Sequence, residues 1–142
     1  MLKIRRFVKG ADEPIWVGVL NAAWKEYTVW WRAITVEEML EQEKRPDFDF
    51  DGRFIAELDG TPVGVIHAHV DKLRKEKKGF VHVFCVVPEY RGFEIEERLL
   101  ESALKELRVR GMNVVQTWTD HSRTERIQLL ERKDFKLVDV ES

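Results

Sequence analysis

The feature that most constrains this 142-residue chain is a strand that stops at a proline and turns through Arg91-Gly92 into a long helix. Residues 79–87 have the apolar and β-branched composition of a buried strand, and Pro88 ends it because proline lacks the amide hydrogen that a strand ladder needs. Apolar side chains then recur at helical spacing as far as Leu107, and residues 113–119 form the next strand segment. This order predicts a right-handed, parallel β-α-β unit.

Two further strand segments precede this unit and are close enough in sequence to pair as hairpins. Residues 53–58 and 62–70 flank Asp59-Gly60, a dipeptide typical of the two-residue turn whose backbone needs positive φ. The charged stretch 72–78 then leads into the strand that ends at Pro88. We interpret it as a solvated loop, with a phosphate-facing patch as the alternative. The middle of the chain therefore predicts three consecutive antiparallel strands.

The remaining elements have recognisable starts. Residues 2–8 alternate like a strand, and Asp12 is placed to cap a first helix. Thr35 to Glu38 forms a capping box for a short second helix, and Ser122 to Glu125 forms one for the last helix. Residues 135–140 predict a final strand. The predicted order is β-α-α-β-β-β-α-β-α-β, an α/β (α+β) fold with a mixed, mostly antiparallel sheet and helices on both faces.

Composition narrows the class of protein. The length and the 44% hydrophobic content fit one domain over residues 1–142. The single cysteine excludes an intramolecular disulfide and a cysteine-based metal site. A net charge of −2 argues against nucleic acid as a partner. No apolar run approaches the roughly 18 residues of a membrane span, and the N-terminus lacks a signal peptide. We expect a soluble, cytoplasmic protein without a membrane partner.

The segment from Val86 to Leu100 resembles the cofactor motif of the GNAT (N-acetyltransferase) superfamily. That motif is a strand ending in Val-x-Pro, then Arg-Gly-x-Gly-x-Gly/Ala, then a helix with paired leucines. The flanking elements agree with the family over essentially the whole chain. The resemblance implies an acyl-CoA-dependent N-acyltransferase that transfers acetyl from acetyl-CoA to an amine, carried by a small molecule or a peptide.

In the family, the helix start binds the pyrophosphate of the cosubstrate, because unpaired amides and the positive end of the helix dipole meet there. The preceding strand carries a bulge, splays from its neighbour and binds the pantetheine arm through backbone groups. By resemblance, the cofactor contacts are Cys85, Val86, Val87, Arg91, Gly92, Phe93, Glu94, Ile95 and Glu96.

The chain departs from the motif at the phosphate turn. Glu94 and Glu96 stand where the family has glycine and glycine or alanine, and Glu97 adds a third carboxylate. At about 5 Å and an effective dielectric of 20, one like-charge pair costs roughly 3 kcal/mol before screening. The same carboxylates also stabilise a helix start that binds no anion. Binding of acetyl-CoA therefore depends on where these side chains point.

The last helix departs from a second family pattern, Asn-x-x-Ala-x-x-Leu-Tyr-Glu-x-x-Gly-Phe. Leu130 holds the position of the tyrosine that usually protonates the leaving thiolate. Arg123 holds the asparagine position and Asp134 the glycine position. The usual acid is therefore absent, which slows thioester aminolysis without forbidding it.

His82 is the candidate catalytic base, since a histidine titrates near neutral pH and its strand leads into the motif. His67 and His69 share one face of the adjacent strand. The alternatives are three ordinary strand histidines, or a zinc site for which no further ligand is evident. For Cys85, a role as a small core residue is favoured over a nucleophile.

Aromatic residues in the first helical region border the place where the family binds its acceptor. Trp24 and Tyr27 continue the apolar stripe of the helix, so core packing accounts for them. Trp30 and Trp31 are adjacent and cannot both face one core, so they are the predicted substrate contacts.

Two hypotheses remain open from the sequence: an N-acetyltransferase, or an inactive GNAT-like domain that acts as a binding or interaction module. The family commonly has two strands after the last helix, where residues 135–140 provide one. We therefore expect an exposed sheet edge that a second subunit covers, giving a homodimer.

Overall fold

The computed structural model describes residues 1–25, 33–44, 51–70, 77–92, 94–119 and 123–136. They form one five-stranded sheet in the order β1-β2-β3-β4-β5. The first four strands pair antiparallel, and β5 runs parallel to β4. The strands are β1 (Leu2–Arg6), β2 (Arg53–Leu58), β3 (Thr61–Val70), β4 (Lys78–Val86) and β5 (Val114–Thr117). The predicted mixed, mostly antiparallel sheet is thus confirmed.

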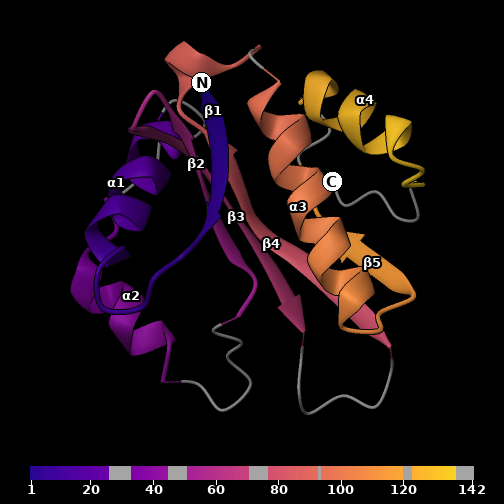
Figure 1. Cartoon of the computed structure of the whole chain (residues 1–142), viewed down its shortest axis with the longest axis horizontal. Helices are drawn as coiled ribbons and strands as arrows, with labels where there is room; N and C mark the ends of the chain where they lie inside the picture. The colour runs from indigo at the N-terminus through magenta and orange to yellow at the C-terminus, as the bar shows by residue number, and fades with distance from the viewer. Residues whose placement is uncertain (26–32, 45–50, 71–76, 93, 120–122, 137–142) are drawn as a thin grey trace.

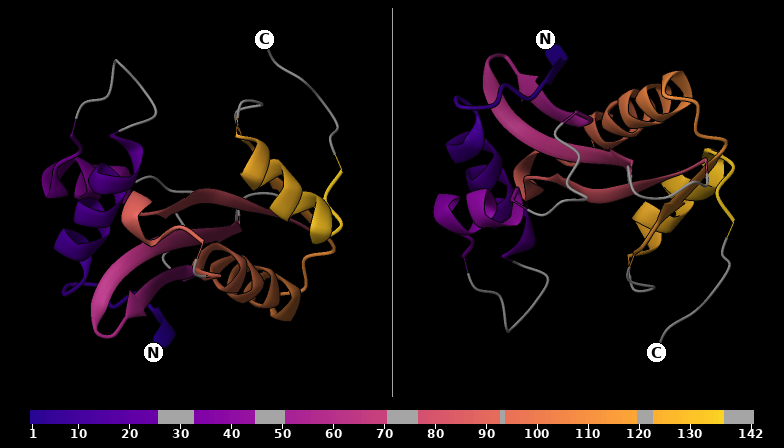
Figure 2. Two further views of the ribbon diagram at one scale, coloured as in Figure 1. Left: turned by 90° about the horizontal axis from the view of Figure 1, so that it is seen from above. Right: turned by 90° about the horizontal axis from the view of Figure 1, so that it is seen from below.

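Helices cover both faces of the sheet, as predicted (Figure 1, Figure 2). On one side lie α1 (Glu13–Trp24) and α2 (Val36–Gln42), and on the other α3 (Ile95–Val109) and α4 (Thr124–Arg132). A short 3-10 turn, η1 (Pro88–Tyr90), links β4 to the segment before α3. None of the helices in the described part of the chain has the length and apolar composition that a membrane span requires.

Two apolar clusters fix these layers, because successive strand residues point to opposite faces of a sheet. The cluster under α3 includes Leu99, Leu100 and Leu107, all fully buried, and it extends to Leu129 and Leu130 of α4. The cluster under α1 is built from that helix and the opposite faces of β2, β3 and β4; its buried members are Trp16, Val17, Val19, Leu20, Ala23, Met39, Ile55, Val65 and Cys85.

The predicted turn and cap residues are largely confirmed. Asp59 and Gly60 both have positive φ, of 51° and 85°, as the two-residue hairpin requires. The Thr35 side chain accepts a hydrogen bond from the Glu38 amide at 3.1 Å, which is the cap expected of α2. Gly111 ends α3 with a φ of 85°.

Asp12 stands before α1 as predicted, but its side chain does not cap the helix. The carboxylate instead accepts a hydrogen bond from the Val8 amide at 2.7 Å and binds the Arg5 guanidinium at 2.7 Å. This pairing holds the pKa of Asp12 below its usual value, the Arg5 hydrogen bond being the largest cause. Arg5 on β1 therefore binds the carboxylate that was expected to cap the helix.

The C-terminal elements differ from the prediction. Ser122, the expected cap of α4, lies outside the described residues, and Arg123 directly precedes the helix. Phe135 and Lys136 belong to no strand, and residues 137–140 of the predicted last strand lie outside the described residues. Strand β5 is accordingly the edge of the sheet within the described chain.

A bulge in β4 is the main irregularity of the sheet. Ile66 pairs with Phe84 but Ala68 pairs with Val81, so two β4 residues, His82 and Val83, oppose one residue of β3. The pairing of β4 with β5 also stops here: it covers Lys78–Val81 against Val114–Thr117. Among the described residues, β4 then continues to Val86 without a strand partner on that side. The bulge and the divergence expected from the family resemblance are therefore both present.

Cys85 offers a test of the core under α1. Burial raises the pKa of its thiol from 9.0 to about 12. The unfolded chain therefore loses this proton first as the pH rises, so the stability contribution is complete below about pH 9 and is lost above it. Between about pH 9 and 12, the free energy of unfolding should fall by about 1.4 kcal/mol per pH unit from this group.

Urea unfolding of the wild type and of Cys85→Ala at about pH 8, 9 and 10 checks this. Cys85→Ala is expected to cost about 1 kcal/mol at pH 8 by leaving a small cavity. The difference between the two proteins should shrink as the pH rises. A difference that stays constant over this range would show that the thiol is not held in its neutral form.

Candidate active site

The open side of β4 presents backbone groups without a strand partner in the described chain. The Val87 amide donates to the Val63 carbonyl at 2.8 Å, so the peptide groups of Val87 and, two residues earlier, Cys85 face β3. Alternation then turns those of Val86 and Phe84 toward the open side. Of the predicted pantetheine contacts, Val86 is therefore the residue with outward-facing backbone groups. Phe84 joins it.

Thr117 closes the paired part of the two strands. Its hydroxyl donates to the Val81 carbonyl at 3.0 Å, at the last pair of the β4–β5 ladder. A side chain thus takes the place of the next ladder hydrogen bond, and the strands separate from there on. The described part of β4 beyond Val81 is therefore an unpaired strand edge that runs toward the start of α3.

The turn before α3 combines a left-handed glycine with the first amides of the helix. Gly92 has a φ of 93°, and a Cβ built there would meet no atom within 4 Å, so the space beside it is open. The first hydrogen bond of α3 runs from the Arg98 amide to the Glu94 carbonyl at 3.1 Å. Because the amides of a first helical turn lack intrahelical acceptors, Ile95 and Glu96 retain donors for an anion. Phe93 lies outside the described residues.

Glu94 and Asp134 occupy positions that hold glycine in the family patterns, and both adopt left-handed backbone conformations. Their φ angles are 63° and 68°. A non-glycine residue in this region costs roughly 1–2 kcal/mol. The two substitutions therefore alter charge and strain while the chain keeps the backbone geometry that glycine would favour.

Two of the three carboxylates at the start of α3 pair with α4. Glu96 lies 3.4 Å from the Arg126 guanidinium, and Glu97 lies 3.1 Å from the Lys133 ammonium. Glu94 is exposed at the mouth of the turn. The negative charge that faces an incoming anion is therefore smaller than the sequence alone indicates.

Arg126 is a residue that the sequence analysis did not single out. Its side chain is 6% exposed, and its guanidinium carbon lies 3.8 Å from the centre of the Phe84 ring. Burial lowers the pKa of Arg126 to about 10, and the positive charge of Arg123 acts in the same direction. The signal was available: Arg126 holds the alanine position of the pattern Asn-x-x-Ala, where a long cation is out of place.

The other predicted residues at this end have clear positions. Arg91 is half-buried, and its guanidinium donates to the Ala23 carbonyl at 3.4 Å, which ties the turn to the end of α1. Leu130 is buried in the core under α3, so the usual tyrosine position supplies no acid. Cys85 is buried with a raised pKa, which excludes a thiolate nucleophile near neutral pH.

A hollow of about 340 Å³ lies between α1, α2 and the bulged part of the sheet. Because of the bulge, both His82 and Val83 line it, although neighbours in a regular strand would face opposite ways. His67 and His69 line it too and are buried. Trp24 is a further lining residue, whereas Trp30 and Trp31, the predicted substrate contacts, lie outside the described residues.

His82 is exposed at this hollow, and its Nε2 lies 3.3 Å from Nδ1 of His69. The ring is nearly parallel to Trp118, at 5.8 Å between centroids, and Phe80 completes the stack. Trp118 follows β5 directly and is 57% exposed, a neighbour that sequence reasoning missed. Within the described residues, no three His, Cys, Asp or Glu side chains are arranged to hold a metal ion.

Buried ion pairs fix one wall of the hollow. Arg53, at the start of β2, binds Glu43 after α2 at 2.5 Å, and both side chains are at most 5% exposed. Lys9 bonds the same carboxylate and also lies 3.4 Å from Glu13 of α1. The Arg53 guanidinium carbon lies 5.2 Å from the Trp16 ring centre. These contacts join α1, α2 and β2 beside the histidines.

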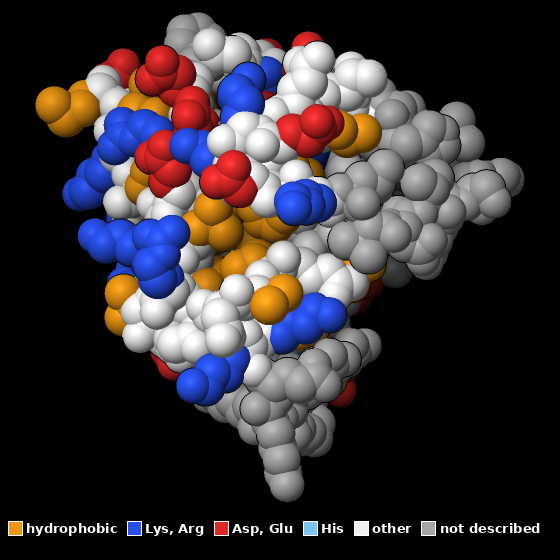
Figure 3. All heavy atoms as spheres, turned by 90° about the vertical axis from the view of Figure 1, so that its right-hand side faces the viewer, with side chains coloured by type: hydrophobic (Ala, Val, Ile, Leu, Met, Phe, Trp, Pro, Cys, Tyr) orange, Lys and Arg blue, Asp and Glu red, His pale blue; other side chains and the backbone are white. Residues whose placement is uncertain are grey.

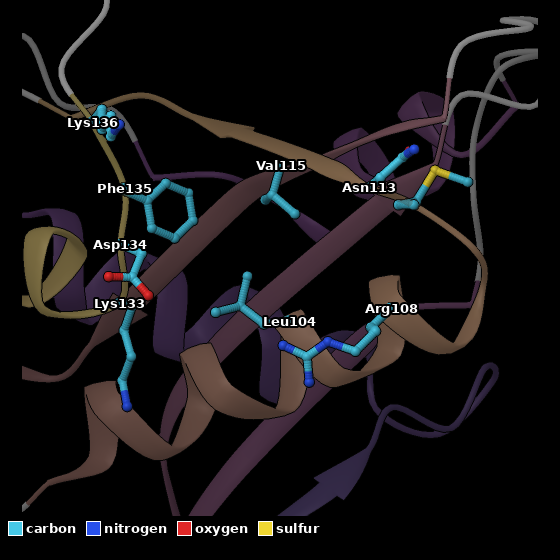
Figure 4. Close-up of a pocket in the computed structure, with 9 residues that line it drawn as sticks. Leu104, Arg108, Asn113, Val115, Lys133, Asp134, Phe135 and Lys136 are labelled. Carbon is cyan, nitrogen blue, oxygen red and sulfur yellow. The ribbon is translucent and has the colours of Figure 1, made fainter.

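On the other side of the molecule, α3, β5 and the chain after α4 enclose a hollow of about 440 Å³ (Figure 3, Figure 4). Leu104, Val115 and Phe135 point into it in Figure 4, while Arg108 and Lys133 lie toward its rim. Apolar side chains are visible within this face between charged ones in Figure 3. The hollow is next to the edge of β5 that has no strand partner within the described chain.

Residues 16–135 match the acetyltransferase (GNAT) family. The chain is 30% identical over 143 residues to a mycothiol acetyltransferase of Thermobispora bispora and 32% identical over 132 residues to one of Thermomonospora curvata. The matches cover 94% and 93% of this chain but 46% and 43% of those relatives. The chain thus spans less than half the length of these curated relatives.

Solved structures show the same fold. The PaiA N-acetyltransferase of Thermoplasma acidophilum, in complex with coenzyme A, has a TM-score of 0.79 at 19% identity, over 99% of this chain and 93% of that one. The ribosomal-protein-S18-alanine N-acetyltransferase of Escherichia coli has a TM-score of 0.75 at 18% identity, over 98% and 80%. Together with the family match over residues 16–135, these findings show that the chain belongs to the acetyltransferase (GNAT) family.

Proposed function

We propose that this chain is an acyl-CoA-dependent N-acyltransferase that moves an acetyl group from acetyl-CoA to the amine of a small molecule or a peptide. The observation that carries the proposal is the divergence of β4 from β5 after Val81. It leaves strand-like donors and acceptors on an unpaired edge of β4 that leads to the first turn of α3. Family membership supports this function, and the longer relatives leave the acceptor open.

The residues present fit the cosubstrate. The outward backbone groups of Val86 and Phe84 suit the amides of a pantetheine arm. The amides of Ile95 and Glu96, beside the open space at Gly92, suit a diphosphate. Acetyl-CoA supplies an activated thioester when bound. The chain supplies orientation, since a reacting amine held beside the thioester reacts far faster than one in free solution.

His82 is the proposed base that accepts the proton of the attacking amine. It is exposed at the hollow beside the bulge, and the contact with Nδ1 of His69 holds its ring in place. The acceptor therefore enters from the side of α1 and α2, opposite α3. Because Leu130 replaces the usual acid, we propose that the departing thiolate takes its proton from solvent.

An inactive binding module is the second candidate, favoured by Glu94. This exposed carboxylate lies at the mouth of the phosphate turn, and its left-handed backbone adds strain. Calorimetric titration of acetyl-CoA and CoA separates the two functions. We expect micromolar binding by the wild type and severalfold tighter binding by Glu94→Gly/Glu96→Gly, because two negative charges leave the turn.

Glu101→Gln is the matched control, since it removes one carboxylate of α3 two turns away from the phosphate turn and should leave affinity unchanged. If the wild type does not bind and the double variant does, the carboxylates have closed the site and the binding module is the better reading. Absence of binding in both proteins would also contradict the acyltransferase proposal.

His82→Gln tests the base. The turnover number with an acceptor amine should fall by about 10²–10⁴-fold, because a positioned base contributes that much, while acetyl-CoA affinity stays the same. Acceptors are found by incubating the wild type with acetyl-CoA and panels of amino acids, polyamines, amino sugars and peptides, and by measuring the mass gain. Unchanged turnover in His82→Gln would remove His82 from the mechanism.

We also propose that residues 1–142 act as one domain that forms a homodimer through the open edge of β5. All described strands share one sheet. Val114 on the edge is 55% exposed, and the apolar hollow lined by Val115 and Phe135 is adjacent. An edge strand of this kind is a template for pairing with a second chain.

Light scattering should give twice the mass of the chain for the wild type and a single mass for Val114→Lys, since a lysine on an edge strand opposes pairing. Val8→Lys is the control, because Val8 is equally exposed, at 55%, but follows β1 at the other edge of the sheet. A wild type that remains monomeric at high concentration would contradict the dimer.

A further inference from the structure

Arg126 is a buried cation with no role in the cofactor site proposed above, which consists of backbone groups. The residue is 5% exposed, and its guanidinium lies over Phe84, on the part of β4 that has already diverged from β5. It therefore lies beside the unpaired edge of β4, on which the peptide groups of Phe84 and Val86 face outward.

The contacts of Arg126 leave one donor unused. Its nearest carboxylate is Glu96, at 3.4 Å, which is at the long end of hydrogen-bonding distance. Its Nε is buried and has no hydrogen-bond partner among the described residues. A buried charge is normally paired and its polar atoms are normally satisfied. Arg126 meets the first condition only through its long contact with Glu96 and does not meet the second, as expected of a group whose partner is a ligand.

The position of Glu96 connects Arg126 to the phosphate turn. Glu96 is in the first turn of α3, so its carboxylate holds the guanidinium next to the amides that face an anion. An arginine fork suits phosphate oxygens, to which it donates two parallel hydrogen bonds. A diphosphate at the start of α3 would be a stronger partner than one carboxylate at 3.4 Å.

We propose that Arg126 is a cofactor-binding residue, which exchanges its contact with Glu96 for the diphosphate of acetyl-CoA and so offsets the carboxylates of the turn. The proposal rests on the proposed acyl-CoA-dependent function. It also explains why the turn accommodates Glu96: the carboxylate is the resting counter-ion of the arginine. Glu97 has its own partner in Lys133, which leaves Glu94 as the exposed charge at the mouth.

The test uses the full chain and two probes, acetyl-CoA and S-acetylpantetheine, which lacks the diphosphate. Arg126→Met keeps an apolar stem over Phe84 and should weaken acetyl-CoA binding at least tenfold in calorimetry, with S-acetylpantetheine binding unchanged. Arg126→Lys should recover part of the loss. Lys105→Met is the control of equal charge change and should have little effect, because Lys105 is exposed on α3 about three turns from its start.

Glu96→Gln provides a second variant that leaves Arg126 in place. It should bind acetyl-CoA severalfold more tightly, since the guanidinium no longer has to leave a carboxylate. This measurement decides the matter if Arg126→Met does not fold, as thermal unfolding would show. Affinity in Glu96→Gln that is unchanged or weaker would overturn the proposal.

Each failure has its own signature. If the wild type binds acetyl-CoA and Arg126→Met binds it equally or more tightly, Arg126 only occupies space beside Phe84. This inference then fails, and the proposed function stands. If both probes lose affinity together in Arg126→Met, the residue supports the part of β4 that binds the pantetheine arm and does not contact the diphosphate. That result also overturns the inference. If the wild type binds neither probe, the proposed function fails and the inference fails with it.

Discussion

The structure depends on one extra residue in β4. His82 and Val83 together lie opposite a single residue of β3, and both side chains face α1 and α2. The same irregularity increases the local twist of the strand, and the ladder to β5 ends beside it, at Val81. A histidine is thereby placed at one hollow, and backbone donors of β4 are left on an unpaired strand edge. Neither would exist in a regular five-stranded sheet, because side chains would alternate and β5 would cover the edge.

Packing of the two helical layers against the sheet offsets the stability that is lost where strand pairing ends. Fully buried leucines of α3 pack across β3 and β4, and the core under α1 includes Val65 and Cys85 on either side of the same ladder. Buried ion pairs add a rigid wall, since removing either partner of Arg53 and Glu43 would leave a charge without compensation. The loss of strand pairing is therefore confined to one edge, where a ligand can satisfy the exposed groups.

Local chemistry explains what the sequence could predict. Asp59-Gly60 and Thr35 specify a turn and a helix cap through local preferences, and both are found as expected. The surroundings of Arg126 and Trp118 depend on residues far away in the chain, whereas the partner of Asp12 is only seven residues away and depends on the path of the chain after β1. Asp12 binds Arg5 because β1 lies alongside it after folding. Arg126 reaches Phe84 through the crossing of α4 over β4, which no spacing rule reveals.

The departures from the family motif have two separate effects, one on backbone conformation and one on side-chain charge, and the structure compensates for both. Glu94 and Asp134 keep the left-handed conformation of glycine, so the path of the chain survives. Glu96 and Glu97 add negative charge, but α4 places Arg126 and Lys133 against them. A helix start that had simply stopped binding anions would need no cation buried beside it, because carboxylates alone stabilise the positive end of a helix. The buried arginine, with a donor left unsatisfied, is the observation that favours a retained anion site over an abandoned one.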